Sequence, residues 1–226
     1  MNADKRPGFR WGETETPNGP CRVPDTMQFA PGATRYAVYA LVGGFALALV
    51  SPLFGAVGLV AAGFVLWFHR DPDRTAPDEG VVSPADGRVS VVREDDDGRV
   101  RVGVFMNVTD IHVNRAPLDG FLEDVERSPG AHRPAFTKSS ERNERVTYTF
   151  GRHEVVLIAG AFARRIHPYL EPGAVVERGD KLGHISFGSR ADVRLPPEYT
   201  LDDVRVEKTE RVTAGESVLA ERDGDE

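Results

Sequence analysis

The longest hydrophobic stretch of the chain covers residues 36–68, none of which carries a charged side chain. As one helix it would extend for roughly 50 Å, because each helical residue adds about 1.5 Å, whereas a hydrocarbon core is about 30 Å thick. Ser51-Pro52 lies near the middle of the stretch, and proline interrupts the hydrogen bonds of a helix. The pattern therefore predicts a membrane hairpin of two short helices, which either spans the bilayer or enters it partway.

Basic residues flank both ends of this stretch, with Arg35 before it and His69, Arg70 and Arg74 after it. Positive charge next to a membrane segment favours the cytoplasmic side. We therefore expect both ends of the hairpin, and the domain that follows it, to face the cytoplasm at the cell membrane. Residues 1–35 are rich in proline and show no hydrophobic periodicity, which predicts an irregular N-terminal arm.

From residue 69 onward the pattern changes to short apolar runs separated by glycine, aspartate or proline. This spacing predicts a mostly antiparallel β domain with few short helices over residues 69–226. The glycines between residues 171 and 185 resemble those at the hairpin corners of lipoyl and biotinyl hammerhead domains, so we expect a compact hammerhead-like or barrel-like architecture. The expected strands are residues 81–82, 88–92, 100–108, 145–150, 154–159, 184–187, 201–206 and 211–219.

Composition narrows the range of partners and cofactors. The formal net charge of −7 argues against a nucleic-acid partner. The single cysteine, Cys21, excludes an internal disulfide and a cysteine-based metal cluster, and the histidines lack the spacing of a zinc site, so we expect no metal. Arginine outnumbers lysine by 24 to 4, which either a high-salt cytoplasm or a GC-rich genome would explain.

Polar residues with chemical potential follow two of the predicted strands. Asp86 lies in an Asp-Gly pair, which is usual in turns but also presents a carboxylate that could do chemistry. His112, Asn114 and Arg115 crowd the exit of the apolar run that ends at residue 108. His112 is either a structural histidine or an acid–base group, since the pKa of histidine lies near neutrality.

Gly188-Ser189 closes the strand-like run at residues 184–187. A serine after a glycine can attack the peptide carbonyl that precedes it, because glycine leaves that carbonyl unshielded and tolerates strained dihedral angles. The same dipeptide is also common in turns, so its meaning depends on the rest of the chain.

Five motifs follow one another over residues 67–196. They are Trp67-Phe68-His69-Arg70-Asp71-Pro72-Asp73-Arg74, Ser83-Pro84-Ala85-Asp86-Gly87, Asp110-Ile111-His112-Val113-Asn114-Arg115-Ala116-Pro117 with Asp119-Gly120, Asn143-Glu144-Arg145, and Phe187-Gly188-Ser189-Arg190 with Leu195-Pro196. Together these motifs resemble the phosphatidylserine decarboxylase family in its short prokaryotic form, a family of pyruvoyl-dependent proenzymes.

The resemblance implies a defined activity. The proenzyme would cut itself between Gly188 and Ser189, and Ser189 would become an N-terminal pyruvoyl group on one chain of a heterodimer of residues 1–188 and 189–226. The pyruvoyl carbonyl would form a Schiff base with the serine headgroup of a phospholipid, and loss of carbon dioxide would leave a phosphoethanolamine headgroup. His112 would protonate the α-carbon, and Asp86 would assist self-cleavage.

One position departs from the family pattern. Longer members carry a second histidine three residues after the one that matches His112, and here that position is Arg115. Either His112 serves both steps or Arg115 acts electrostatically; Arg115 and Asn114 are also candidates for binding the substrate, with Arg115 on the lipid phosphate. The substrate would be ester-linked phosphatidylserine or the ether-linked archaetidylserine, which the salt-adapted composition slightly favours.

Two other functions stay open from the residues alone. One is a non-enzymatic, membrane-anchored hammerhead module that acts as a carrier or adaptor, although Lys181 lacks the flanking methionines usual at a modified lysine. The other is an uncleaved serine hydrolase that uses Ser189 with His112 and Asp86. Cleavage before Ser189 would distinguish the decarboxylase from both.

Overall fold

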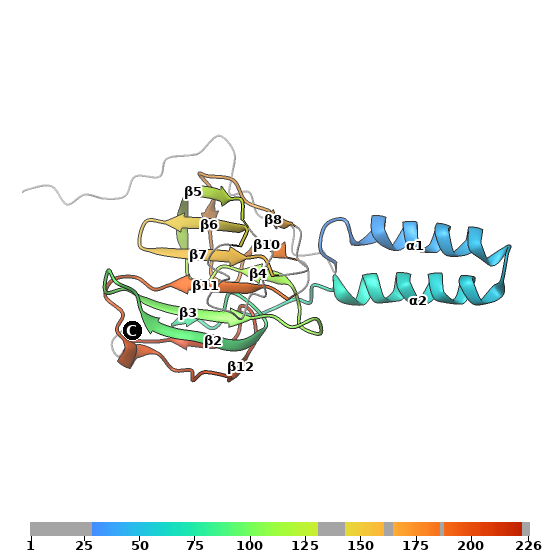
Figure 1. The fold of residues 1–226 in the computed structure, drawn as a ribbon. Coiled ribbons are helices and arrows are strands. Elements are labelled where there is room, and N and C mark those ends of the chain that lie inside the picture. The colour runs from blue at the N-terminus through green and yellow to red at the C-terminus, as the bar shows by residue number, and fades with distance from the viewer. Residues whose placement is uncertain (1–28, 131–142, 161–164, 186–187, 223–226) are drawn as a thin grey trace, which may run out of the picture.

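The computed structural model describes residues 29–130, 143–160, 165–185 and 188–222. Most of the predicted N-terminal arm, Cys21 and Phe187 of the last motif therefore lie outside the described residues. Within them, a helical hairpin projects from one end of a β domain (Figure 1).

The hydrophobic stretch forms two helices that lie side by side, α1 (Ala33–Ala48) and α2 (Pro52–Phe68). The chain reverses before Pro52, because Ser51 is extended, accepts a hydrogen bond from Leu53 N on its hydroxyl and so caps α2. Gly44 and Gly58 let the helices approach closely, since a Cβ atom on Gly58 would lie 2.4 Å from Gly44 Cα. The predicted division of this stretch into two helices at Ser51-Pro52 is confirmed.

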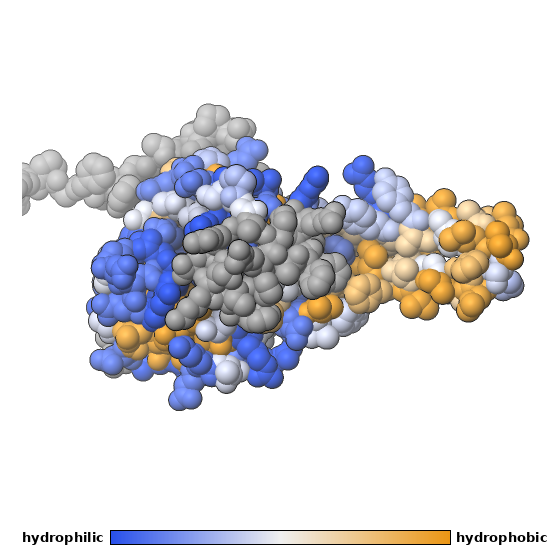
Figure 2. All heavy atoms as spheres, viewed as in Figure 1, coloured by the Kyte–Doolittle hydropathy of each residue, from blue (hydrophilic) through white to orange (hydrophobic). Residues whose placement is uncertain are grey.

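The membrane part of that prediction is not supported in the same way. Among the described residues, no helix combines the length and the apolar character that crossing a membrane would require. Large apolar side chains are nevertheless exposed along both helices (Figure 2), including Phe45, Leu49, Leu53 and Val60. At the base of the hairpin, the segment before α1 pairs with the segment after α2 through a hydrogen bond of 2.8 Å from Ala30 N to the carbonyl oxygen of residue 69.

The rest of the chain is mainly β and antiparallel, as predicted, and its described strands form sheets of eight, three and two strands. The eight-stranded sheet is curled (Figure 1) and has the order β12-β2-β3-β11-β7-β6-β5-β9, while the smaller sheets are β4-β10-β8 and β1-β13. The strands are β1 (Val81–Val82), β2 (Gly87–Glu94), β3 (Val100–Phe105), β4 (Val113–Arg115), β5 (Gly120–Ser128), β6 (Arg145–Phe150), β7 (His153–Ile158), β8 (Ile166–Pro168), β9 (Val175–Val176), β10 (Lys181–Ile185), β11 (Arg190–Arg194), β12 (Arg211–Val212) and β13 (Val218–Ala220).

The core lies against one face of the curled sheet. In β6 every second residue is buried, and these residues are Val146, Tyr148 and Phe150. They belong to one apolar cluster with Leu157 of β7 and Val193 of β11. Because burial of apolar surface contributes about 25 cal/mol per Å², this cluster holds neighbouring strands of the sheet together.

Strand β11 positions the residue that follows Gly188. Arg190 at its start pairs with Phe105 at the end of β3 and with Ile158 at the end of β7. Residue 189 therefore lies directly before the first residue of β11, level with the C-terminal ends of the neighbouring strands β3 and β7. The last two strands also return to the start of the domain, since β12 pairs with β2 and β13 pairs with β1.

Several strand predictions need correction. Residues 201–206 begin with a 3-10 turn at Leu201–Asp203 instead of a strand, because Thr200 and Asp203 cap that turn. The strand expected at residues 184–187 begins earlier, at Lys181, and its last two residues lie outside the described residues. Strands β4, β5, β8, β9 and β11 were not predicted. The mainly β prediction is confirmed in the form of a curled sheet.

Candidate active site

Ser189 is fully buried and lies directly before the first residue of β11. Its carbonyl oxygen accepts a hydrogen bond of 2.9 Å from Met106 N, which continues the pairing of β11 with β3 by one residue. Gly188 has a φ of +64°, a left-handed conformation that side chains disfavour. The backbone therefore turns sharply at the peptide bond that the sequence marks for attack.

The Ser189 hydroxyl is held only weakly. It donates to Met106 Sδ at 3.9 Å, and a thioether sulfur is a weak acceptor. Asn114 Nδ2 approaches the same sulfur at 3.6 Å and also donates to Pro84 O at 3.3 Å. The side chain of Met106 thus brings Ser189, Asn114 and the segment that contains Pro84 together, and the hydroxyl is free of any strong competing hydrogen bond in the part of the chain that the structure describes.

A close backbone contact requires glycine at position 87, in the Asp86-Gly87 pair. Gly87 has a φ of +148°, and a Cβ atom there would lie 2.1 Å from Phe105 O. Only glycine lets this segment run directly against the end of β3, beside Met106. The backbone at Gly87 therefore packs against Phe105 and Met106, and Met106 in turn contacts the Ser189 hydroxyl.

His112 is buried, with 3% of its surface exposed. Its Nδ1 lies 2.9 Å from Asp110 O, which accepts only if Nδ1 carries the proton, and its Nε2 has no partner within the described ranges. Burial lowers the pKa of His112 to about 4, so the ring is neutral at pH 7. His112 O accepts from Ile185 N at 3.1 Å, which ties this residue to the strand that leads toward Gly188. A neutral imidazole with a free Nε2 can both accept and return a proton.

Asp86 is engaged with groups other than those expected. Its carboxylate forms an ion pair of 3.1 Å with Arg74 and accepts from Ala214 N at 2.8 Å. Burial raises the pKa of Asp86, and these two contacts only partly oppose that effect. Within the described residues no hydrogen bond joins Asp86 to Ser189 or to His112, so the predicted group of three is not connected directly.

Arg115 is buried and paired inside the protein. Its Nη2 lies 3.0 Å from Asp71 Oδ1 and donates to Pro72 O at 2.9 Å, while Nη1 donates to Gly179 O at 2.9 Å. Lys181 Nζ approaches the other oxygen of Asp71 at 2.8 Å. This geometry gives Arg115 a role in holding the segment after α2, and it leaves the guanidinium poorly placed to meet a lipid phosphate.

The end of α2 and the segment that follows it supply partners to two of the other motifs, those that contain Asp86 and His112, which the sequence pattern alone did not reveal. Phe68 packs on the ring of His112 at a centroid distance of 4.6 Å, Asp71 pairs with Arg115, and Arg74 pairs with Asp86. The sequence indicated only that these residues belong to the first of the five motifs. Their contacts could be identified only from the folded structure. The motif therefore connects the hairpin to the candidate site.

A cavity of about 300 Å³ lies at the base of the hairpin. Its wall combines apolar helix residues with imidazole rings; the lining residues are Tyr36, Phe64, Val65, Phe68, His69, His167 and His184. His184 lies 2.9 Å from the Tyr169 hydroxyl and stacks on His167 at 4.5 Å, and burial lowers the pKa of His184 to about 3. Phe68 lines this cavity and packs on the ring of His112, so this one buried side chain connects the cavity with the candidate site.

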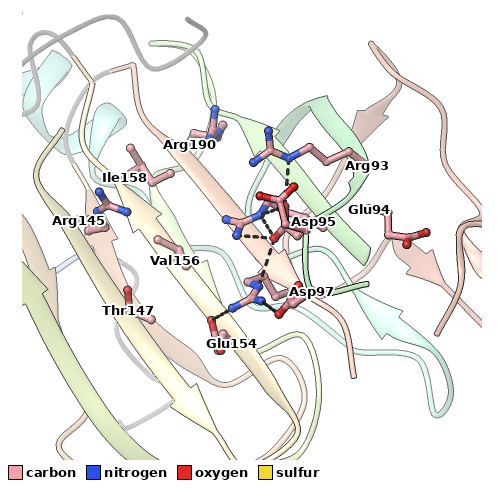
Figure 3. Close-up of a pocket in the computed structure, with 13 residues that line it drawn as sticks. Arg93, Glu94, Asp95, Asp97, Arg145, Thr147, Glu154, Val156, Ile158 and Arg190 are labelled. Atoms are coloured by element: carbon pink, nitrogen blue, oxygen red, sulfur yellow. Dashed lines mark hydrogen bonds and ion pairs between the residues drawn. The ribbon is translucent and has the colours of Figure 1, made fainter. Parts of the chain in front are cut away.

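A second hollow, a groove of about 880 Å³, lies on the face of the curled sheet that carries charged residues (Figure 3). Its acidic and basic side chains pair with one another, as Arg101 does with Asp95 at 2.6 Å and Arg194 with Glu154 at 2.8 Å. We therefore assign this groove a structural role. Among the described residues, no cluster of three or more histidine, cysteine or acidic side chains could hold a metal ion.

Comparison with known proteins agrees with the motifs. The family model for phosphatidylserine decarboxylase matches residues 61–220. A relative from Halobacterium salinarum, provisionally named an archaetidylserine decarboxylase proenzyme, is 61% identical over 191 residues, which cover 84% of this chain and 97% of the relative. A phosphatidylserine decarboxylase proenzyme from Streptomyces griseus is 51% identical over 160 residues, which cover 69% of this chain and 73% of that protein. The chain belongs to the phosphatidylserine decarboxylase family.

Proposed function

We propose that this chain is the proenzyme of a phospholipid decarboxylase that converts a phosphoserine headgroup to phosphoethanolamine and carbon dioxide. The observation that carries this function is Ser189 itself, a buried serine that follows a left-handed glycine and whose hydroxyl, among the described residues, contacts only a thioether sulfur. Family membership supports the same activity, because the relatives named above are decarboxylase proenzymes.

Self-cleavage follows from ordinary serine chemistry. Ser189 Oγ attacks the carbonyl carbon of Gly188, the C–N bond breaks, and the hydroxyl proton passes to the amide nitrogen, which leaves an ester. Loss of the Cα proton of residue 189 then expels the Gly188 carboxylate and forms a dehydroalanine. Its imine tautomer takes up water and releases ammonia, so that residue 189 ends as a pyruvoyl group on the chain 189–226, which stays bound to residues 1–188.

The surroundings of Ser189 fit a pyruvoyl group. The hydroxyl that would be lost makes only a weak contact, and the methyl group that would replace it lies beside the side chain of Met106. The amide carbonyl of residue 189 is retained, together with its hydrogen bond from Met106 N. When formed, the group supplies an electrophilic carbonyl that takes up the electron pair left on the substrate when carbon dioxide departs.

His112 is the best candidate for moving protons. Its Nε2 is free, its ring is neutral at pH 7, and its Nδ1 is fixed by Asp110 O. Arg115 is committed to Asp71, so we propose that His112 serves both as the base in self-cleavage and as the acid that protonates the α-carbon. An anionic headgroup beside His112 would raise its pKa from about 4 toward neutrality and so load it with the proton that is needed. The raised pKa of Asp86 supports a secondary, proton-sharing role during self-cleavage.

We propose that the hairpin anchors the enzyme at the cytoplasmic face of the cell membrane. Its exposed apolar side chains and the flanking basic residues Arg35, Arg70 and Arg74 support this placement. Helices of 16 and 17 residues reach about 25 Å at 1.5 Å per residue, which favours shallow insertion over a full span. The cavity at the hairpin base would then receive the lipid near its headgroup.

The lipid is expected to be archaetidylserine. The reaction involves only the headgroup, so the chemistry itself does not select between ether and ester lipids. The name of the Halobacterium relative, at 61% identity, favours the ether lipid, as does the arginine-rich, acidic composition.

Intact-mass measurement of the purified protein tests the proposal. We expect two chains, 1–188 and 189–226, the second with a blocked N-terminus, and release of carbon dioxide from archaetidylserine vesicles, with phosphatidylserine vesicles as the comparison. Ser189→Ala should yield one uncut chain without activity. A single unmodified full-length chain in the wild type would refute the decarboxylase and favour the uncleaved hydrolase or the carrier module.

A further inference from the structure

Self-cleavage would create a free chain end in the middle of the sheet. β11 lies between β3 and β7, and it begins one residue after the proposed cut. In the uncut chain, residue 189 is held covalently through Gly188, whereas in the cut enzyme it is a free chain end. Strand ends fray when nothing restrains them, and this end would carry the reactive carbonyl.

The structure has a restraint at this position. Asp192 is fully buried, and its carboxylate binds the Arg190 guanidinium through two parallel hydrogen bonds, Nε to Oδ1 at 2.7 Å and Nη2 to Oδ2 at 2.9 Å. Arg101 Nη1 of the neighbouring β3 also lies 3.4 Å from Asp192 Oδ2. A bidentate pair of this kind fixes both the position and the orientation of a guanidinium.

The neighbouring strand is shaped to admit this carboxylate. A Cβ atom on Gly103 would lie 2.5 Å from Asp192 Oδ1, so only glycine at that position leaves room. Gly103 stands opposite Asp192 in the β3–β11 register. Figure 3 shows Arg190 at the wall of the charged groove, one residue from Ser189 in sequence.

We propose that Arg190 and Asp192 act as a clamp that keeps the new chain end docked after self-cleavage. The inference rests on the proposed cleavage before Ser189. The clamp ties the side chain of Arg190 to Asp192, which lies two residues further along the same strand and next to Arg101 of β3, while Met106 N holds residue 189 through its amide carbonyl, which survives the cleavage. Both residues of the pair are positioning residues for the pyruvoyl group, and their contribution is needed once the covalent bond to Gly188 is gone.

The test compares cut and uncut protein by hydrogen exchange of the peptide that contains residues 190–194. Asp192→Asn is made in the self-cleaving chain and in the Ser189→Ala background, which stays covalently closed. We expect about tenfold faster exchange at the start of β11 in the cut variant, the size of one lost charge-assisted hydrogen bond, and little change in the uncut one. Arg194→Gln, at the other end of the same strand, is the matched control and should respond equally in both backgrounds.

Arg190→Lys is the second variant, because it keeps the charge and loses the bidentate geometry; it should give the same contrast. Equal exchange of wild type and Asp192→Asn in the cut enzyme would overturn the clamp. So would equal loss of protection in both backgrounds, which would mark a purely structural pair, or folded variants that no longer cut themselves, which would place the pair before cleavage. If the wild-type chain itself is uncut by mass, the proposed function fails and the clamp fails with it.

Discussion

Asp71 is a buried carboxylate shared by two buried cations. Arg115 Nη2 lies 3.0 Å from one of its oxygens and Lys181 Nζ lies 2.8 Å from the other, and the three side chains are at most 6% exposed. Asp71→Asn keeps the shape but removes the charge, and it turns an amide NH₂ group toward one of the cations. Removing one partner of a buried ion pair costs about 3–5 kcal/mol, because the remaining charge stays desolvated. We expect a loss of that size in the free energy of unfolding.

The assay is thermal unfolding in the Ser189→Ala background, where the protein stays one chain and the transition is not complicated by cleavage. For a domain of this size each kcal/mol lowers the midpoint by about 2–4 °C, so we expect a fall of at least about 6 °C. Asp73→Asn is the matched control, because Asp73 is exposed, and it should change stability by less than about 0.5 kcal/mol.

The second variant tests the reason as well as the size of the effect. Adding Lys181→Met to Asp71→Asn removes one of the two stranded cations, and it should recover at least about 1 kcal/mol of the loss. A loss below about 1 kcal/mol for Asp71→Asn alone, or a further loss on adding Lys181→Met, would refute the argument that desolvated charge dominates at this site.

Three further outcomes follow from the geometry. His112→Gln should slow self-cleavage and, in the fraction of protein that has been cut, should lower kcat for carbon dioxide release by about 10²–10⁴, because His112 is proposed for both steps; unchanged cleavage with an unchanged kcat would remove His112 from the reaction. The free energy of unfolding should fall as the pH falls from 6.5 toward 4, because His112 and His184 take up protons in this range only when the protein unfolds. The fall should be up to about 1.4 kcal/mol per pH unit for each of these neutral buried histidines. Denaturant titrations that show stability rising as the pH falls would contradict this. Gly87→Ala should destabilise by about 2 kcal/mol or more, since its Cβ meets a carbonyl oxygen at 2.1 Å, whereas Gly63→Ala has open space and should be neutral or stabilising in the same titration.

Some parts of the fold follow from local pattern. The uncharged stretch with Ser51-Pro52 predicts the hairpin because proline, an N-cap and apolar character all act within a few residues. The strands at residues 145–150 and 154–159 could be predicted because polar residues alternate with apolar or aromatic ones in β6 and because β7 ends in four consecutive apolar residues. The candidate serine was found through the order of motifs, and its burial and left-handed glycine agree with that choice. The membrane placement of the hairpin stays a proposal.

Other parts depend on contacts that no local pattern contains. Strand β11 was missed because Arg190, Asp192 and Arg194 alternate with small or apolar residues. Arg190 and Asp192 neutralise each other, and Arg101 of β3 and Glu154 of β7 supply further partners. Arg115 looked like a substrate or relay residue, yet its partner Asp71 lies 44 positions earlier in the chain. The ion pair of Asp86 could likewise not be predicted from the sequence, because the position of Arg74 in the fold was not known. Such long-range ion pairs replace the expected connections to Ser189.

The three strands that follow Ser189 give the proposed maturation a thermodynamic consequence. β11 pairs with β3 and β7, β12 pairs with β2, and β13 pairs with β1. All of these partner strands precede the cut. Folding of the proenzyme is therefore a one-molecule event, whereas refolding of the mature enzyme would require two chains to meet. Its apparent stability would depend on protein concentration, and unfolding at cellular dilution would be irreversible in practice. Each molecule would thus assemble its central strand once, and the lifetime of the mature enzyme would be set by its rate of unfolding.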